Sequence, residues 1–386
     1  MKVLGFTGSR ADYYLQQSLF KRLNGNPNIQ LEIIVSGSIL EEHNNKTLND
    51  IKSDRISVAA HVPLLDSDNH SIQVAQLLIK LDPIIVASQA DVALVYADRY
   101  ESFAFALAAF HQDLVVMHLE AGDITEGGTY DDSIRHCITK ISHIQATSTE
   151  QGLQVVRAMG EQPWRSARVG LLSYESIDEI SVEDAMFVFD SLGLNQEKSL
   201  IIATMHPIPM DLELTKKETV EFLKGLEYAS QSDRFSFILT APNRDQGSDI
   251  ISKLISEFLP KISNSFYVES LGGFRYQALL SLARVMNVIV CGNSSSVVKE
   301  APFFGAHGLN VGRRQLGREK AESQIDIAAD SKMIAQSLID LSSTKCTIKP
   351  NPYKTDYPSA KAVDFLLDIF KNRSRSELLL KRWHFA

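Results

Sequence analysis

The nineteen residues from His118 to His136, HLEAGDITEGGTYDDSIRH, concentrate ionisable side chains. They include five carboxylates, two histidines and one arginine, and they continue the apolar run that begins LVVM. A carboxylate that ends a buried strand is partly desolvated, which raises its pKa and suits it to proton transfer near neutral pH. The stretch therefore predicts an acid/base cluster, and the alternative is a solvated acidic loop.

Three carboxylates stand out as candidates for this chemistry. Glu120 falls at the end of the apolar run, and Asp131 opens the next helical pattern, one turn before Arg135 on the same helix face. Asp98 ends a second apolar run, LVYADRYE, where it could act as a base or instead cap the following helix. His118 and Glu120 could in principle bind a metal ion, but no PCxxC or HExxH motif accompanies them, so we predict no metal site.

The segment TGSRADYY, Thr7 to Tyr14, turns from the first apolar run into a helical pattern. Gly8 permits a tight turn, and the amides that follow could bind an anion with help from Arg10. The alternative is a simple helix cap made by Ser9 or Asp12. The segment lacks the GxGxxG spacing, so it does not predict dinucleotide binding.

The segment GNSSSVVKEAPFFG, Gly292 to Gly305, follows another apolar run. Three serines at the start of a helix provide hydroxyls and free amides that suit a phosphate group. Glu300 lies six residues after Ser294 and could accept both hydroxyls of a ribose. Redundant helix capping is the alternative, but capping does not need three serines.

Short apolar runs alternate with helical patterns in two successive arrays. The first array predicts strands over residues 2–8, 29–37, 91–98, 114–122 and 143–150, with helices over 71–81 and 102–112. The second predicts strands over 199–207, 235–243, 287–293 and 307–312, helices over 216–229 and 257–262, and a final helix over 359–380. Two such arrays predict two doubly wound α/β domains, with ligand-binding residues at the carboxyl ends of the strands.

The composition limits the classes of partner and compartment. The formal net charge of −8 argues against a general nucleic-acid binder or a protein that binds anionic membranes. The three cysteines, Cys137, Cys291 and Cys346, are far apart and odd in number, which favours a reducing compartment. The N-terminus lacks an apolar signal segment and no run approaches eighteen apolar residues, so we expect a cytoplasmic protein.

Taken in order, the motifs resemble those of the hydrolysing UDP-N-acetylglucosamine 2-epimerases, over about residues 2 to 325. They are TGSRADYY, VYADRYE, HLEAGDITEG with RHCITK, TMHP, TAPNRD, LGGFRY, GNSSSVVKEAP and NVGRRQLGR. The resemblance implies a GT-B-like fold of two Rossmann-like domains, residues 1–172 and 173–352, with the nucleotide sugar in the cleft and a C-terminal helix in 353–386 on the first domain. It implies a homo-oligomer, a dimer or a tetramer, that needs no cofactor.

The resemblance also assigns roles to individual residues. Its catalytic residues fall on Asp98, Glu120, Asp131 and His206. Its substrate-binding residues fall on Arg10, Asp12, Asn243, Arg275, Ser294, Ser295, Glu300 and Arg314. The sequence departs from the family pattern at Ala97, where a glycine is usual, and at GLLSYES, which lacks a proline. The loop before the RH pair is also longer than usual, so Asp131 and Asp132 compete for one role.

The reaction that the resemblance implies inverts C2 of the sugar and releases the nucleotide. UDP is eliminated across C1 and C2 to leave a 2-acetamidoglycal, and water then adds to give free N-acetylmannosamine for sialic or nonulosonic acid synthesis. A UDP- or GDP-linked 2,4-diacetamido-trideoxyhexose is a further candidate substrate. The alternatives are a non-hydrolysing epimerase, a GT-B glycosyltransferase that needs an acceptor, and a nucleotide-sugar sensor without turnover.

Overall fold

The structure is a computed structural model of residues 1–386. It describes the chain except residues 41–44, 66, 68, 128–129, 176–179, 244 and 385–386, and the side chains of residues 10, 45 and 46. The described residues form two compact units. The first contains Met1–Asp123, Asp131–Glu175 and Thr355–Ala386, and the second contains Ile124–Tyr130 and Ser176–Lys354.

The first unit is built on a parallel sheet of seven strands in the order β3-β2-β1-β4-β5-β6-β7. The strands are β1 Lys2–Thr7, β2 Gln30–Ser36, β3 Ser57–Val62, β4 Val92–Tyr96, β5 Val115–Leu119, β6 Ile144–Thr147 and β7 Ser166–Arg168. Every residue of β4 and β5 is buried, as expected for central strands with helices on both faces. This is why continuous apolar runs predicted the central strands correctly.

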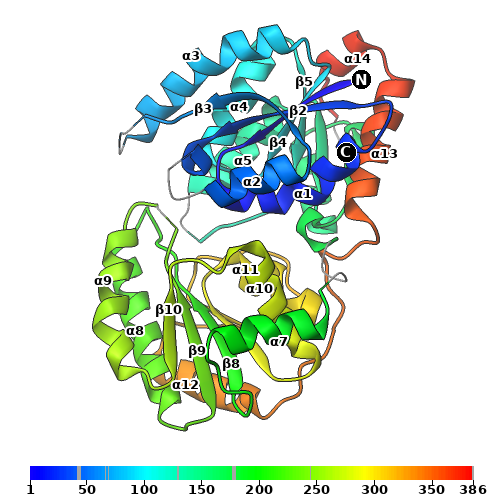
Figure 1. Ribbon diagram of the computed structural model, residues 1–386. Coiled ribbons are helices and arrows are strands. Elements are labelled where there is room, and N and C mark those ends of the chain that lie inside the picture. The colour runs from blue at the N-terminus through cyan, green and yellow to red at the C-terminus, as the bar shows by residue number, and fades with distance from the viewer. Residues whose placement is uncertain are drawn as a thin grey trace. The chain divides into compact units, whose positions relative to one another are not determined.

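Helices cover both faces of this sheet (Figure 1). They are α1 Arg10–Asn24, α2 Asn45–Ser53, α3 His70–Ser88, α4 Tyr100–His111, α5 Tyr130–Ile141, α6 Glu150–Ala158, α13 Pro358–Asn372 and α14 Arg375–Leu379. One core places Leu77 of α3, Phe105 of α4 and Ile138 of α5 against the sheet. The core on the other face takes Phe20 from α1 and Leu366 from α13.

The C-terminal segment packs on the first unit as two helices. The prediction of one helix over 359–380 is wrong, because Arg373 is extended, with φ −130° and ψ 137°. Ser374 then begins α14 with a capping box, in which its hydroxyl accepts from the Glu377 amide and the Glu377 carboxylate accepts from the Ser374 amide. The buried Arg165 guanidinium donates to the carbonyls of Glu377 and Leu378 and so anchors this end of the chain.

The second unit has a parallel sheet of six strands in the order β10-β9-β8-β11-β12-β13. The strands are β8 Ser199–Thr204, β9 Phe235–Thr240, β10 Ser265–Val268, β11 Val288–Gly292, β12 His307–Val311 and β13 Gln324–Ile327. The helices are α7 Val182–Ser191, α8 Leu212–Ser230, α9 Ser248–Phe258, α10 Gly272–Ser281, α11 Ser295–Lys299 and α12 Ser331–Ser342. The helix predicted over 257–262 is instead the end of α9 followed by a short 3-10 turn at Leu259–Lys261.

Four strands were not predicted from the sequence, and all four are edge strands: β3, β7, β10 and β13. The middle of β10 and of β13 is exposed, and in β3 exposed residues alternate with more buried ones. An edge strand has a neighbour on one side only, so it does not need the continuous apolar run that marks a central strand.

The two parallel sheets confirm the expected fold class, a GT-B-like pair of doubly wound α/β units. The segment Ile124–Tyr130, which the sequence placed in the first domain, groups with the second unit. Two hydrogen bonds account for this. The Glu126 amide donates to the Leu316 carbonyl over 2.9 Å, and Arg318 donates to the Thr125 hydroxyl over 3.1 Å.

Candidate active site

Asp98 and Glu120 lie at the carboxyl edge of the first sheet. The strands that precede them, β4 and β5, are paired so that Tyr96 lies beside Leu119. Each strand is followed directly by a residue with left-handed backbone, Ala97 with φ 55° and Glu120 with φ 60°. A side chain in this region costs roughly 1–2 kcal/mol, and such strain gathers at functional sites. The left-handed backbone at Ala97 also explains why a glycine is usual there in the family pattern.

Arg135 of α5 is the buried cation that organises this edge. Its guanidinium forms an ion pair with Asp98, donates to the Asp123 carbonyl over 2.8 Å and reaches the Asp132 carboxylate at 3.3 Å. Burial alone would lower the pKa of Arg135, but the charges of Asp98, Asp123 and Asp132 raise it above its ordinary value. Asp98 does not occupy the N-cap position of α4, because Arg99 is the N-cap residue, and the Arg99 side chain makes no capping hydrogen bond.

Glu120 is held by a tyrosine that the sequence analysis did not single out. The Tyr96 hydroxyl donates to Glu120 Oε1 over 2.5 Å, and both side chains are buried. Burial and the Glu120 charge raise the pKa of Tyr96 well above its ordinary value of 10. Tyr96 therefore stays protonated, and its hydroxyl orients Glu120 by donating a hydrogen bond to it. The sequence could have indicated Tyr96, because it is the last residue of the strand that precedes Asp98.

His118 positions the turn that carries Asp98. Its Nε2 lies 2.7 Å from the Ala97 carbonyl and its Nδ1 lies 3.0 Å from the Thr139 hydroxyl. A carbonyl only accepts, so Nε2 carries the proton. Burial lowers the pKa of His118 to about 4, so the ring is neutral at physiological pH. His118 thus supports the Ala97 turn. Among the described residues, no group of three or more His, Cys, Asp or Glu side chains is arranged to hold a metal ion.

The two competing carboxylates, Asp131 and Asp132, lie in the first turn of α5, and both are partly exposed. Asp132 lies 3.3 Å from Arg135 and 3.6 Å from the His136 ring. It therefore belongs to the network around Asp98, through the three-residue spacing to Arg135. Asp131 and Asp132 both remain candidates for the third carboxylate.

Asp12 is a further buried carboxylate, in the first turn of α1. Its amide donates to the Ser9 hydroxyl, so Ser9 caps this helix as one interpretation of TGSRADYY expected. Burial, with a smaller contribution from Glu101, raises the pKa of Asp12 to about 6, and Arg99 opposes the shift. Its Oδ2 has no hydrogen-bond partner among the described residues. A buried acceptor of this kind suits a substrate hydroxyl. The side chain of Arg10 lies outside the described residues.

We expect Asp12→Asn to stabilise the fold above pH 6. The pKa in the folded state, about 6, exceeds the ordinary value of 3.8, so the charged form is disfavoured by folding. The native state therefore loses stability as the pH rises from about 4 to 6. The variant should gain up to about 3 kcal/mol of unfolding free energy at pH 8 and less than about 1 kcal/mol at pH 4. Urea unfolding at both pH values measures this, with the exposed Asp364→Asn as control, and a gain independent of pH would contradict it.

In the second unit, His206 follows strand β8. The Asn293 side chain accepts from the His206 amide over 2.6 Å and donates to its carbonyl over 2.9 Å. His206 Nδ1 accepts from the Asn243 amide over 3.0 Å, so the proton lies on Nε2. Burial, and then the charge of Arg314, lowers the pKa of His206 to about 3. His206 is therefore neutral at physiological pH, and its Nε2–H can donate a hydrogen bond.

The GNSSS segment follows β11 through a turn that only glycine permits. Gly292 has φ 129°, and a Cβ there would lie 1.9 Å from the Thr204 carbonyl oxygen. Ser294 caps α11, where its hydroxyl accepts from the Ser296 amide. The Ser296 hydroxyl instead pairs with Tyr276, whose pKa is raised by burial and by Glu300. One serine of the three is thus sufficient for capping.

Asn293 also connects His206 to the arginine loop. Its carbonyl accepts from Arg314 over 3.2 Å and from Gln315 over 2.9 Å, and the Arg314 side chain is buried. The structure therefore brings His206, Asn243 and Arg314 together around Asn293, a residue that the sequence analysis did not select. The sequence could have indicated Asn293, because it is the first residue after β11. Arg275, on α10, is exposed.

Comparisons with known proteins decide the family. A family model described as UDP-N-acetylglucosamine 2-epimerase matches residues 21–367. The chain belongs to this family. It is 30% identical to a hydrolysing UDP-N,N'-diacetylbacillosamine 2-epimerase of Legionella pneumophila, over 84% of this chain and 85% of that protein. It is 27% identical to a hydrolysing GDP/UDP-N,N'-diacetylbacillosamine 2-epimerase of Campylobacter jejuni, over 84% of each.

Solved structures of the family share the fold of this chain. The UDP-GlcNAc 2-epimerase of Neisseria meningitidis bound to UDP-GlcNAc superimposes with a TM-score of 0.81 at 18% identity, over 95% of this chain and 100% of that one. At this identity the likeness shows the fold alone, and it agrees with the two doubly wound units found here. The family resemblance read from the motifs is confirmed.

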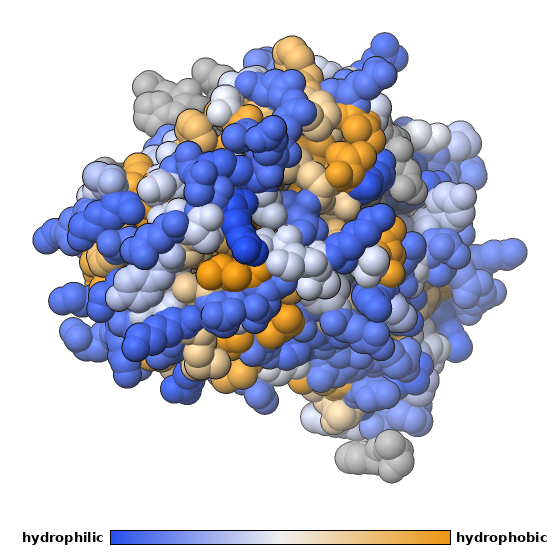
Figure 2. Space-filling view, turned by 90° about the horizontal axis from the view of Figure 1, so that it is seen from below, coloured by the Kyte–Doolittle hydropathy of each residue, from blue (hydrophilic) through white to orange (hydrophobic). Residues whose placement is uncertain are grey.

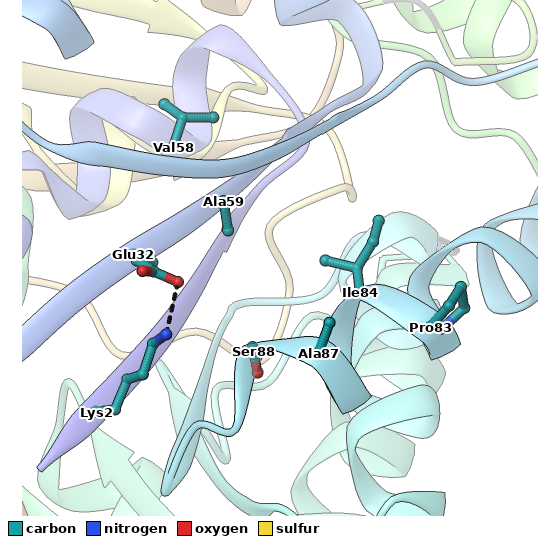
Figure 3. Close-up of a pocket in the computed structure, with 8 residues that line it drawn as sticks. All are labelled: Lys2, Glu32, Val58, Ala59, Pro83, Ile84, Ala87 and Ser88. Carbon is teal, nitrogen blue, oxygen red and sulfur yellow. Dashed lines mark ion pairs between the residues drawn. The ribbon is translucent and has the colours of Figure 1, made fainter.

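The first unit has a hollow of about 550 Å³ that lies away from the candidate site residues (Figure 3). Lys2 and Glu32, whose charged groups are 3.1 Å apart, lie on one side of it. Pro83, Ile84 and Ala87 of α3 lie on the other. Lys2 begins β1, so the hollow is near the amino ends of the strands, whereas ligands of parallel α/β sheets bind at the carboxyl ends. None of the predicted site residues lines it.

Among the described residues, α3 is the one helix that resembles a membrane-spanning segment, although it contains no uninterrupted run of eighteen apolar residues. This helix has 19 residues and a mean hydropathy of 1.3 over its best 18-residue window, so by length and composition it could cross a membrane. Only 28% of that window is buried, although one side of the helix contributes to the core. The helix contains Lys80 and Asp82, which interrupt its apolar run.

Proposed function

We propose that this chain is a hydrolysing 2-epimerase, which converts a nucleotide-linked N-acetylamino sugar into nucleoside diphosphate and the free sugar inverted at C2. The observation that carries the proposal is the pair Asp98 and Glu120 at one sheet edge, held by the buried Arg135 and Tyr96. The names of the two relatives above favour water as the second substrate. The candidate substrates are UDP-N-acetylglucosamine and UDP- or GDP-linked N,N'-diacetylbacillosamine.

The reaction needs two proton-transfer groups at C2. One group removes the C2 proton while the C1–O bond breaks and its electron pair leaves with the nucleoside diphosphate, which gives the glycal. Water then adds its oxygen to C1, and a proton returns to C2 from the opposite face. Asp98 and Glu120 supply these groups, with Asp131 or Asp132 as the third carboxylate. General acid–base catalysis of this kind contributes typically about 10²–10⁴-fold for each group.

We assign nucleotide binding to the residues of the second unit. Arg314 and Arg275 would balance the charge of the diphosphate, and the Nε2 proton of the neutral His206 would donate to it. Ser294 and Ser295 would add hydroxyls and amides, and Glu300 would accept the ribose hydroxyls. Arg10, Asp12 and Asn243 complete the proposed binding set. With these donors no metal ion is required, and the reaction uses no cofactor.

Glu300→Ala should weaken UDP binding by about 10- to 150-fold. The physical reason is the loss of charge-assisted hydrogen bonds to the ribose, which contribute about 1.5–3 kcal/mol. Isothermal titration calorimetry with UDP measures the change. Glu257→Ala, on the exposed side of α9, is the matched control. An unchanged dissociation constant for Glu300→Ala would remove the ribose assignment.

Incubation of the protein with a panel of nucleotide sugars in deuterated water tests the proposed function. The panel contains UDP-N-acetylglucosamine and UDP- and GDP-linked N,N'-diacetylbacillosamine, and chromatography with NMR identifies the products. We expect nucleoside diphosphate and a free epimeric sugar with deuterium at C2, in the presence of a chelator.

Each alternative function gives a different result in this experiment. A nucleotide-linked product would indicate a non-hydrolysing epimerase, and turnover only with an acceptor would indicate a glycosyltransferase. Binding without turnover would indicate a sensor. Product without deuterium at C2 would overturn the mechanism. The three free cysteines favour a reducing compartment and so support our assignment of the protein to the cytoplasm.

A further inference from the structure

Glu218 is a buried carboxylate of the second unit to which the proposed reaction gives no role. Charged side chains usually remain in water, and the face of the protein in Figure 2 is accordingly mainly hydrophilic, with hydrophobic residues in small separate patches. Glu218 of α8 is only 5% exposed, and its Oε2 has no hydrogen-bond partner among the described residues. Burial raises its pKa, although the amide and the charge of Arg313 oppose the shift. Such a group costs stability, so its presence calls for another explanation.

The arginine loop, residues 312–318, begins on the Glu218 carboxylate. Gly312 is the first residue after β12 and has φ 81°, and a Cβ there would lie 2.3 Å from Glu218 Oε2. The same carboxylate accepts a hydrogen bond from the backbone amide of Arg313. Only glycine permits both this backbone conformation and this close approach. The start of the loop therefore has a fixed point of contact on α8.

Other contacts hold the middle of the arginine loop. The Asn293 carbonyl accepts from Arg314 over 3.2 Å and from Gln315 over 2.9 Å, and the Leu316 carbonyl accepts from the Glu126 amide over 2.9 Å. The Arg314 side chain is buried between these contacts and the start of the loop. The direction in which the loop enters this arrangement thus depends on the carboxylate beneath its first residues.

The same face of α8 also holds the segment that follows His206. Thr215 lies three residues before Glu218 and is also buried, and its hydroxyl accepts from the Ile208 amide over 2.9 Å. Residues three apart lie on one face of a helix. The first turns of α8 therefore set the positions of both segments to which we assign the diphosphate, the one that contains His206 and the one that contains Arg314.

We propose that Glu218 is a positioning residue for nucleotide binding, which holds the arginine loop so that Arg314 meets the diphosphate of the substrate. Glu218 acts through the loop and does not itself contact the substrate. A loop that is already ordered loses less entropy when a ligand binds, so the affinity for the nucleotide depends on this carboxylate. This inference rests on the proposed function, because it uses the assignment of the diphosphate to Arg314.

Isothermal titration calorimetry with UDP tests the role of Glu218. Glu218→Gln keeps the shape of the side chain and removes the charge, so it should raise the dissociation constant of UDP by about 5- to 30-fold. Glu213→Gln, at an exposed position on the same helix, is the matched control. In the nucleotide-sugar assay, KM should rise by a similar factor while kcat changes less than about 3-fold.

Thermal unfolding at pH 8 separates positioning from a merely structural role. The pKa of Glu218 in the folded state is raised above its ordinary value of 4.5, so folding disfavours the charged form at this pH. Glu218→Gln should therefore unfold at the same temperature as the wild type or at a higher one, although it binds UDP more weakly. A lower unfolding temperature together with weaker binding would assign Glu218 to the stability of the fold and overturn the inference.

A double-mutant cycle tests the contact with the loop directly. Gly312→Ala should raise the dissociation constant of UDP about 10-fold or more, because its methyl group displaces the loop from Glu218. In a Glu218→Ala background the same change should cost at least about 3-fold less, since the carboxylate no longer occupies that space. Equal costs in both backgrounds, or unchanged UDP binding by Glu218→Gln, would overturn this inference alone. Absence of UDP binding by the wild type would overturn the nucleotide assignment as well.

Discussion

Glu120→Gln and Asp98→Asn are each expected to lower kcat by about 10²- to 10⁴-fold. Each change keeps the size of the side chain and removes the group that accepts or returns a proton at C2. Tyr96→Phe should reduce kcat less, because it removes only the donor that orients Glu120. Nucleotide release followed under saturating substrate measures these changes.

Measurement of UDP binding distinguishes a variant that has lost catalytic activity from one that no longer folds. We expect its dissociation constant to change less than about 3-fold in these variants, because we assign the nucleotide to residues of the second unit. Asp113→Asn is the matched control, since Asp113 is exposed and asparagine tolerates its left-handed backbone. Near-normal turnover in Glu120→Gln and Asp98→Asn would support a solvated acidic loop. A comparison of Asp131→Asn with Asp132→Asn identifies the third carboxylate.

Arg135→Met is expected to lower the free energy of unfolding by about 3–5 kcal/mol. The change removes a buried cation that holds Asp98, Asp132 and the Asp123 carbonyl, and it leaves these acceptors without their donor. Arg135→Lys should recover only part of this loss, because an ammonium group cannot match the planar fork of donors. Chemical denaturation at pH 7 measures both variants.

A double-mutant cycle shows whether the Asp98 ion pair accounts for this loss. In an Asp98→Asn background the cost of Arg135→Met should fall by about 1–3 kcal/mol, because the ion pair between the two residues is already absent. Strict additivity of the two changes would show that Arg135 stabilises the fold through other contacts. Lys224→Met, at a partly exposed ion pair with Glu221, is the control, and there we expect less than about 1 kcal/mol.

The family, the fold class and the central strands were predictable from the sequence. Central strands of a parallel sheet are buried on both faces, so β4 and β5 appear as continuous apolar runs, and the polar residues after them mark the carboxyl edge. The edge strands β3, β7, β10 and β13 escaped because a half-exposed strand needs no such run. The break between α13 and α14 escaped because the apolar periodicity continues through Arg373, where only the capping box at Ser374 marks a new helix.

Only the tertiary structure decided which side chains meet. The sequence offered Asp98 as a base or as a helix cap, and the structure pairs it with Arg135, 37 residues later. Tyr96 and Asn293 were not selected, because their roles depend on neighbouring strands and loops that bring Glu120 and His206 to them. Hydrophobic periodicity and helix caps are local features of the chain. The sequence by itself therefore determined the helices, the central strands and the sheet edge at which catalysis is possible. Ion pairs and hydrogen bonds join residues far apart in the chain, so the partners of each catalytic candidate follow only from packing.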